Sequence, residues 1–204
     1  MITSSAFEEI ASRFGAVASW AVWADAGDTP KSNIADLSVL HPAHNPTLLR
    51  ILHARSVLVG LNFSRPVDAS VRPFANFHDP NPRATDFKLR FALRGTPLWG
   101  SYMTDIIKHV EEVDSSRLMK RLRLEPELEL RSIRVFRDEL GLLGPTPPLL
   151  IALGKRVEAI LRRNFRDGHE VVTIPHYADY SAKEKYRAQV EERLQPYLER
   201  LRQQ

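Results

Sequence analysis

The sequence predicts an α/β fold, a three-layer α/β/α sandwich around a central four-stranded parallel sheet. Short apolar runs at 57–61, 100–105, 149–153 and 170–174 have the length and composition of buried strands. Segments with helical periodicity separate these runs, and strands joined through helices pair in parallel with right-handed crossovers. Polar residues end three of the runs, and ligands of open α/β sheets bind outside the carboxyl ends of the strands.

The first half of the chain is predicted to hold one helix, an irregular connection, the first strand and a long loop. The capping-box spacing of residues 5–8 opens the helix, whose apolar face continues to Val17. Residues 24–47 are rich in Asp, Pro, Asn and His and form the connection. The loop at 63–97 contains five prolines, and its aromatic residues indicate that it is packed.

The second half alternates strands and helices. Helical periodicity covers parts of 114–140, and Gly141 is the expected stop. Gly154 turns the strand at 149–153 directly into the next helix, and a capping box at 181–184 opens the last one. The inward face of that last helix is predicted to consist of Tyr186, Val190, Leu194, Tyr197, Leu198 and Leu201.

Length and composition set further expectations. A chain of 204 residues is predicted to form one domain, with a helix and irregular extension at 1–50 and a core at 57–201. The absence of cysteine excludes disulfides, thiolate-held zinc and cysteine-ligated iron–sulfur clusters. No segment has the character of a membrane span or secretory signal, so we expect a cytoplasmic location and no membrane partner. We also expect a monomer. The formal net charge of +4 is compatible with a polyanionic partner.

Four motifs carry a family resemblance. Gly-Leu-Asn-Phe-Ser at 60–64 is similar to the Gly-x-Asn-Pro-Gly/Ser motif of the uracil-DNA glycosylase superfamily, especially its mismatch-specific and single-strand-selective branches. Residues 103–107 are similar to the Thr-Asn-hydrophobic-Val segment of the mismatch-specific branch, and 150–155 resembles the third core strand and helix start. Residues 174–181 occupy the place of the His/Met/Asn-Pro-Ser insertion loop. The motifs lie in the family's order across 57–201. With the four predicted strands numbered along the chain, the expected order in the sheet is 2-1-3-4.

The resemblance implies a DNA glycosylase that needs no cofactor. Such an enzyme hydrolyses the N-glycosidic bond of uracil, or of another deaminated or modified base, after flipping it out of DNA. By resemblance, Asn62 orients the attacking water, and an Asp at this position would do the same. His176 would stabilise the departing base or contact a phosphate. For an isolated Asn, the alternative is that it ends the strand by bonding its own turn, and a lone loop His is more often simply solvated.

Further residues are candidates for contact with base and DNA. Asp105 stands where the family usually has an Asn that reads the base edge, and an ionised carboxylate would favour a base that shows donors; alternatively, it caps a helix after the strand. Phe74 and Phe77 could stack on the base, although packing in the loop core is expected of at least one of them. Lys155, at a helix start, could contact a phosphate, and Tyr177 could wedge between base steps. The complete candidate set is Asn62 and His176 for catalysis, Leu61, Phe63, Phe74, Phe77 and Asp105 for the base, and Ser64, Lys155, Pro175, Tyr177 and Ser181 for DNA.

Two departures from the family leave a second function open. Phe63 replaces the usual Pro, and Pro175-His176-Tyr177 replaces the Pro-Ser loop. The alternative is therefore a catalytically inactive module on the same fold that binds nucleic acid or nucleotides. A dinucleotide enzyme is disfavoured because no G-x-G-x-x-G follows the first strand. No metal is expected, because the spacing of His41, His44, His78 and Asp79 matches no standard zinc site.

Overall fold

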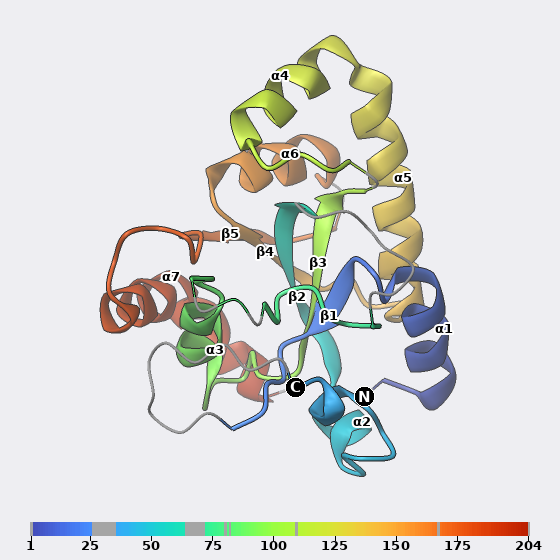
Figure 1. The fold of residues 1–204 in the computed structure, drawn as a ribbon, viewed down its shortest axis with the longest axis vertical. Coiled ribbons are helices and arrows are strands. Elements are labelled where there is room, and N and C mark those ends of the chain that lie inside the picture. Colours follow the sequence, from blue (N-terminus) through green and yellow to red (C-terminus); the bar gives the residue numbers. More distant parts are fainter. Residues whose placement is uncertain are drawn as a thin grey trace.

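The computed structural model describes residues 2–25, 36–63, 72–79, 81, 83–108, 110–166 and 168–203. Ser64, one of the DNA-contact candidates, lies outside the described residues. The described part of the chain forms an α/β fold with a mixed sheet of five strands (Figure 1). The strands are β1 (Ala18–Trp20), β2 (His53–Asn62), β3 (Ser101–Ile107), β4 (Leu149–Leu153) and β5 (Val171–Ile174).

The predicted fold class is confirmed, and the predicted sheet is correct only in part. The sheet order is β1-β3-β2-β4-β5, in which β3, β2, β4 and β5 run parallel and β1 pairs with β3 in the antiparallel direction. The purely parallel, four-stranded sheet is therefore wrong, although its strands follow one another in the expected sequence. β1 has three residues, all buried, so it shows neither the alternation nor the length that identifies a strand from sequence.

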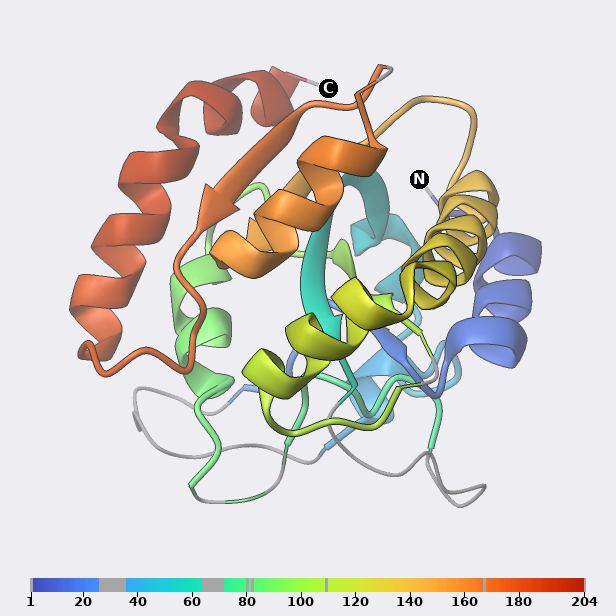
Figure 2. The same cartoon turned by 90° about the horizontal axis from the view of Figure 1, so that it is seen from above.

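Helices cover both faces of the sheet, which gives the predicted three layers (Figure 2). On one face, helices α1, α4, α5 and α6 pack against the side chains of Val57, Val59 and Tyr102. On the other face, α3 and α7 pack against Leu58 and Met103. The helices are α1 (Ser4–Phe14), α2 (Leu48–Ile51), α3 (Phe87–Leu93), α4 (Ser115–Leu124), α5 (Pro126–Leu142), α6 (Lys155–Asn164) and α7 (Lys183–Gln203), with a short 3-10 turn η1 (Ser38–Leu40).

Several helix boundaries differ from their predictions. Thr3 rather than Ser5 caps α1, because Thr3 Oγ1 accepts the hydrogen bond from the Ala6 amide at 3.1 Å. The helical pattern at 114–140 is two helices, since Pro126 starts a second one, and α5 continues through Gly141 to Leu142. Helix α3 lies within the stretch that was expected to be loop. None of the helices in the described segments has the length and apolar run needed to cross a bilayer.

Candidate functional site at the carboxyl edge of the sheet

The strand register brings three of the predicted site residues to one level of the sheet. Val59 pairs with Ala152 on β4, and Ala152 pairs with Thr173 on β5. Three positions after Val59, Ala152 and Thr173 come Asn62, Lys155 and His176, respectively. All three residues therefore lie at the carboxyl ends of neighbouring strands. Because adjacent strands are about 4.8 Å apart, three of them span roughly 10 Å, which is a distance that one nucleotide can bridge.

The Asn62 side chain is held by the backbone that follows β3. Its Nδ2 donates to the carbonyl oxygens of Glu112 at 2.8 Å and Val110 at 3.1 Å, and to that of Phe63 at 3.3 Å. These contacts fix the orientation of the side-chain amide. They leave Oδ1 as the hydrogen-bond acceptor of the group. A half-buried amide oxygen in a fixed orientation can accept a hydrogen bond from water, but it cannot take the proton as a carboxylate can.

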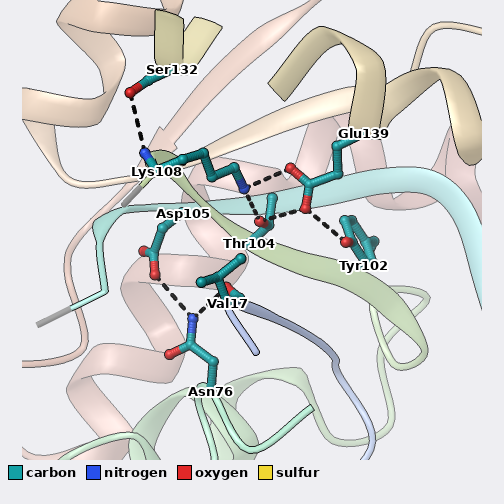
Figure 3. Close-up of polar contacts among 8 residues, drawn as sticks. All are labelled: Val17, Asn76, Tyr102, Thr104, Asp105, Lys108, Ser132 and Glu139. Atoms are coloured by element: carbon teal, nitrogen blue, oxygen red, sulfur yellow. Dashed lines mark hydrogen bonds and ion pairs between the residues drawn. The ribbon is translucent and has the colours of Figure 1, made fainter. Parts of the chain in front are cut away.

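Asp105 lies inside β3, one pleat below the level of Asn62. It pairs with Gly60, and a Cβ atom at Gly60 would stand 2.2 Å from Asp105 Oδ1, so the carboxylate occupies the space that the glycine leaves. Asn76 Nδ2 donates to Asp105 Oδ2 at 2.9 Å and also to the carbonyl oxygen of Val17 at 2.7 Å (Figure 3). The helix-cap alternative for Asp105 is wrong, because β3 continues to Ile107.

Burial changes the acid strength of Asp105. The residue is 5% exposed, and removal of its carboxyl group from water raises the pKa to about 6, against the opposing effect of the Asn76 hydrogen bond and the Lys108 charge. Asp105 is mostly ionised at pH 7 and accepts hydrogen bonds there. Below pH 6 the protonated carboxyl group becomes a donor. Its hydrogen-bonding character therefore changes close to neutral pH.

The loop around Phe74 and Phe77 approaches the site in a strained conformation. Both residues have positive φ, 66° and 64°, which is unusual for bulky side chains. Ser19 Oγ donates to the Phe74 carbonyl at 2.8 Å, and Trp23 Nε1 donates to the Phe77 carbonyl at 3.2 Å. These bonds from β1 and the residues after it hold the loop in place and offset part of the strain.

The two phenylalanines have different surroundings. The Phe74 ring packs against Phe7 of α1 at 5.2 Å and is buried in the core, and Phe77 is buried in the core on the other face of the sheet, so both take the packing alternative. Phe77 lies beside the strand ends, since a Cβ atom at Gly60 would come within 3.4 Å of its Cζ. The structure therefore brings Phe77, and not Phe74, next to Gly60 and Asp105.

His176 follows β5 and lies against the turn into α6. The Gly154 amide donates to the Ile174 carbonyl at 2.9 Å, and a Cβ atom at Gly154 would be 3.7 Å from that of His176. The Ala178 amide donates to His176 Nδ1 at 3.1 Å, which places the proton of the neutral ring on Nε2. Burial lowers the pKa of His176, against the opposing charge of Asp179, so the ring is neutral at pH 7 with an Nε2–H donor.

The rest of the β5–α7 loop is anchored by Asp179. Lys88 of α3 donates to the Asp179 carbonyl at 2.6 Å and lies 3.6 Å from its carboxylate. Asp179 Oδ1 accepts from the Ser181 hydroxyl at 2.6 Å, so Ser181 is engaged within the loop, and α7 begins only at Lys183. The Pro175 carbonyl accepts from the Tyr186 hydroxyl at 3.2 Å. Lys88 is a residue of the site region that sequence reasoning missed.

Tyr180 is a second residue of the site region that the sequence analysis did not identify. Tyr177, the predicted wedge, stacks on His176 with ring centroids 4.4 Å apart and is partly buried. Tyr180 is fully exposed on the same loop. Its place between the turn-forming Asp179 and Ser181 is the sequence signal that could have indicated an outward-pointing ring.

The remaining candidates lie around these groups. Lys155 is exposed at the first residue of α6, a helix whose N-terminus has no side-chain cap and so can attract a phosphate. Its neighbour Arg156 binds the hydroxyl groups of Ser115 and Ser116 and so ties α6 to the start of α4. Leu61 packs into the core on the α1 and α5 side, away from Asp105. Phe63 follows β2 directly and is half-buried.

Comparisons with protein-family models, with curated proteins and with solved structures give no match to this chain. Within the described ranges, no group of three or more His, Asp or Glu side chains could hold a metal ion. The rings of His41 and His44 lie 5.2 Å apart, and His78 is buried against Trp23. The residues that bear on function are therefore those of the four motifs and of the carboxyl edge of the sheet.

Proposed function

We propose that this chain is a DNA glycosylase that hydrolyses the N-glycosidic bond of uracil, or of another deaminated or modified base, after the nucleotide leaves the duplex. The observation that carries the proposal is the common level of Asn62, Lys155 and His176 at the carboxyl edge, together with the fixed amide of Asn62. A water acceptor, a phosphate-binding group and a hydrogen-bond donor for the base are the three groups that this reaction requires.

The proposed chemistry uses these groups in one step. Asn62 Oδ1 accepts a hydrogen bond from the water whose oxygen attacks C1′ of an oxocarbenium-like sugar. As the bond between C1′ and the base breaks, its electron pair goes to the base, and the Nε2–H of neutral His176 stabilises the developing negative charge. The proton of the water passes to solvent. The protein contributes orientation and electrostatic stabilisation, and no residue forms a covalent bond to the sugar.

Base and strand contacts complete the proposal. Asp105, next to Gly60, accepts a hydrogen bond from a ring N–H or amino group, which uracil and deaminated purines carry, whereas the buried ring of Phe77 is not assigned to stacking on the base. Tyr180, which is exposed on the β5–α7 loop, would fill the gap that an extruded base leaves in the stack. Lys155 and the N-terminus of α6 bind a phosphate.

The test is single-turnover release of the base from oligonucleotides that each carry one altered base. Asn62→Ala should lose base release while keeping its fold and DNA affinity, because the amide acts mainly in the transition state. Asn62→Asp should also lose activity, contrary to the expectation from sequence. Its carboxylate would face the carbonyl oxygens of Val110 and Glu112, which now accept from Nδ2.

Two outcomes would overturn the proposal. Wild-type rates in folded Asn62→Ala would remove the catalytic assignment. Wild-type protein that binds DNA but releases no base from a broad panel would instead be the catalytically inactive binding module.

A further inference from the structure

A buried ion pair lies on the opposite side of β3 from Asp105 (Figure 3). Lys108 Nζ stands 2.6 Å from Glu139 Oε2, and the two side chains are 1% and 0% exposed. Glu139 Oε1 accepts from the hydroxyl groups of Tyr102 at 2.7 Å and Thr104 at 2.8 Å. Lys108 Nζ also donates to Thr104 Oγ1 at 2.6 Å. Both carboxylate oxygens and the ammonium group are therefore engaged between β3 and α5.

Stability alone does not account for this pair. Transferring two charges from water to a protein interior costs several kcal/mol per ion, and apolar replacements of similar volume are often as stable. The surroundings of Lys108 are apolar apart from its polar partners, with the rings of Phe14 and Phe136 5.8 and 5.7 Å from Nζ. Such pairs are best explained where they fix one geometry out of several.

The ion pair is linked to Asn62 through the backbone that follows β3. Lys108 is the first residue after β3, and its backbone amide donates to Ser132 Oγ of α5 at 3.2 Å. Its side chain and its backbone are thus both attached to α5. The carbonyl groups of Val110 and Glu112, two and four residues further on, are the ones that hold Asn62 Nδ2. The contacts of Lys108 with α5 therefore lie two and four positions along the chain from the carbonyl groups that hold the Asn62 amide.

We propose that the Lys108–Glu139 ion pair is a positioning unit, which sets the backbone after β3 so that its carbonyl groups orient Asn62. The inference deepens the proposed function, since it assigns these residues an effect on the reaction through Asn62. Neither residue contacts the nucleotide. The unit acts by holding Oδ1 of Asn62 where the attacking water lies, and a displacement of about 1 Å there costs on the order of 100-fold in rate.

The experiment removes both charges together, because a single substitution would leave one buried charge unpaired. The double variant Lys108→Met/Glu139→Gln retains an acceptor for Tyr102 and Thr104. Because a displacement of about 1 Å costs on the order of 100-fold, we expect the single-turnover rate of base release to fall by roughly 10- to 100-fold. DNA affinity should stay within about twofold of wild type. In an Asn62→Ala background the same double change should not lower the residual rate of base release any further, because the unit acts through Asn62.

Two controls separate positioning from a general loss of structure. Arg121→Gln/Glu125→Gln removes an exposed ion pair at the C-terminal end of α4 and should leave the rate unchanged. Ser132→Ala is a milder variant that removes only the acceptor of the Lys108 amide, and it should lower the rate in the same direction. If the double variant does not fold, Ser132→Ala carries the test.

A second readout is independent of catalysis. The side-chain NH2 resonances of Asn62, recorded by NMR in the protein without DNA, should shift and exchange faster with solvent in the double variant. If wild type releases no base but these resonances change, the glycosylase proposal fails and the positioning of Asn62 stands. If wild type is active and the double variant changes neither the rate nor the resonances, the positioning proposal is overturned.

Discussion

Asp105 is a buried carboxylate whose Oδ2 accepts a hydrogen bond from the Asn76 amide, and this environment makes its charge depend on pH in a measurable way. The native state keeps the proton up to a pKa of about 6, whereas an ordinary Asp has a value of 3.8. The stability that the protonated form provides is therefore fully present below pH 3.8 and is lost as the pH rises through 6. Asn is the permanently neutral isostere and keeps an acceptor for Asn76.

Asp105→Asn should therefore gain stability relative to wild type as the pH rises. The difference in unfolding free energy between the two proteins should grow by about 3 kcal/mol from pH 3.5 to pH 7.5, since the pKa moves from 3.8 to about 6. Urea unfolding at several pH values measures it. A difference that stays constant over this range would show that Asp105 titrates as an ordinary exposed carboxyl group.

Two buried histidines make the comparison with wild type necessary. Burial lowers the pKa of His53 to about 4 and that of His78 to about 3, from an ordinary value of 6.5. Both proteins therefore lose stability as the pH falls from 6.5 through these values, because the unfolded chain takes up protons first. This loss is common to both proteins and cancels in the difference.

At the scale of elements, the turn from β4 into α6 controls where His176 lies. Gly154 has φ 97° and ψ 163°, a conformation that is almost restricted to glycine, and the His176 Cβ lies within contact distance of the space beside it. Gly154→Ala should therefore cost about 1–3 kcal/mol through backbone strain, although the added methyl group has room.

The chain offers a matched control for this substitution. Gly141 lies inside α5, and a Cβ atom there would meet nothing within 4 Å. Gly141→Ala should stabilise the protein by about 0.5–1 kcal/mol, because alanine loses less backbone entropy in a helix. Thermal unfolding should thus show opposite signs for the two changes. A neutral Gly154→Ala would mean that this turn relaxes without strain.

The same elements show what sequence could predict. Four strands and the Gly154 turn were readable because apolar runs and a glycine between strand and helix are local signals. The predicted site residues at the ends of β2 and β5, Asn62 and His176, follow from that same local pattern. β1 and α3 were not readable, since one has three residues and the other lies among prolines.

Other parts of the site depend on contacts between distant segments. Asn76 reaches Asp105 across 29 positions, and Glu139 reaches Thr104 across 35. The positive φ of Phe77 depends on a loop held from β1 and the residues after it. No local periodicity encodes such pairs, because each member has an ordinary local alternative.

At the scale of the whole molecule, charge and the position of the carboxyl edge determine how DNA would bind. The chain carries a formal net charge of +4. Lys155 lies at the edge where Asn62 and His176 end their strands, with the open N-terminus of α6 beside it. Arg202, near the end of α7, is exposed at the other edge, since the neighbouring Leu201 carbonyl accepts from Arg55 near the start of β2. Lys155 and Arg202 thus carry the same charge but lie at different edges of the sheet.

DNA binding should weaken as salt rises, because each neutralised phosphate releases counterions. Lys155→Ala should weaken binding by a similar factor across base sequences and reduce the slope of log K against log salt by about 1, the contribution of one phosphate contact. Arg202→Ala removes the same net charge and should leave the slope unchanged. Fluorescence anisotropy with a labelled duplex at several salt concentrations measures both. Equal slopes for the two variants would mean that overall charge, and not the carboxyl edge, attracts DNA, and absence of binding at low salt would exclude DNA as the partner.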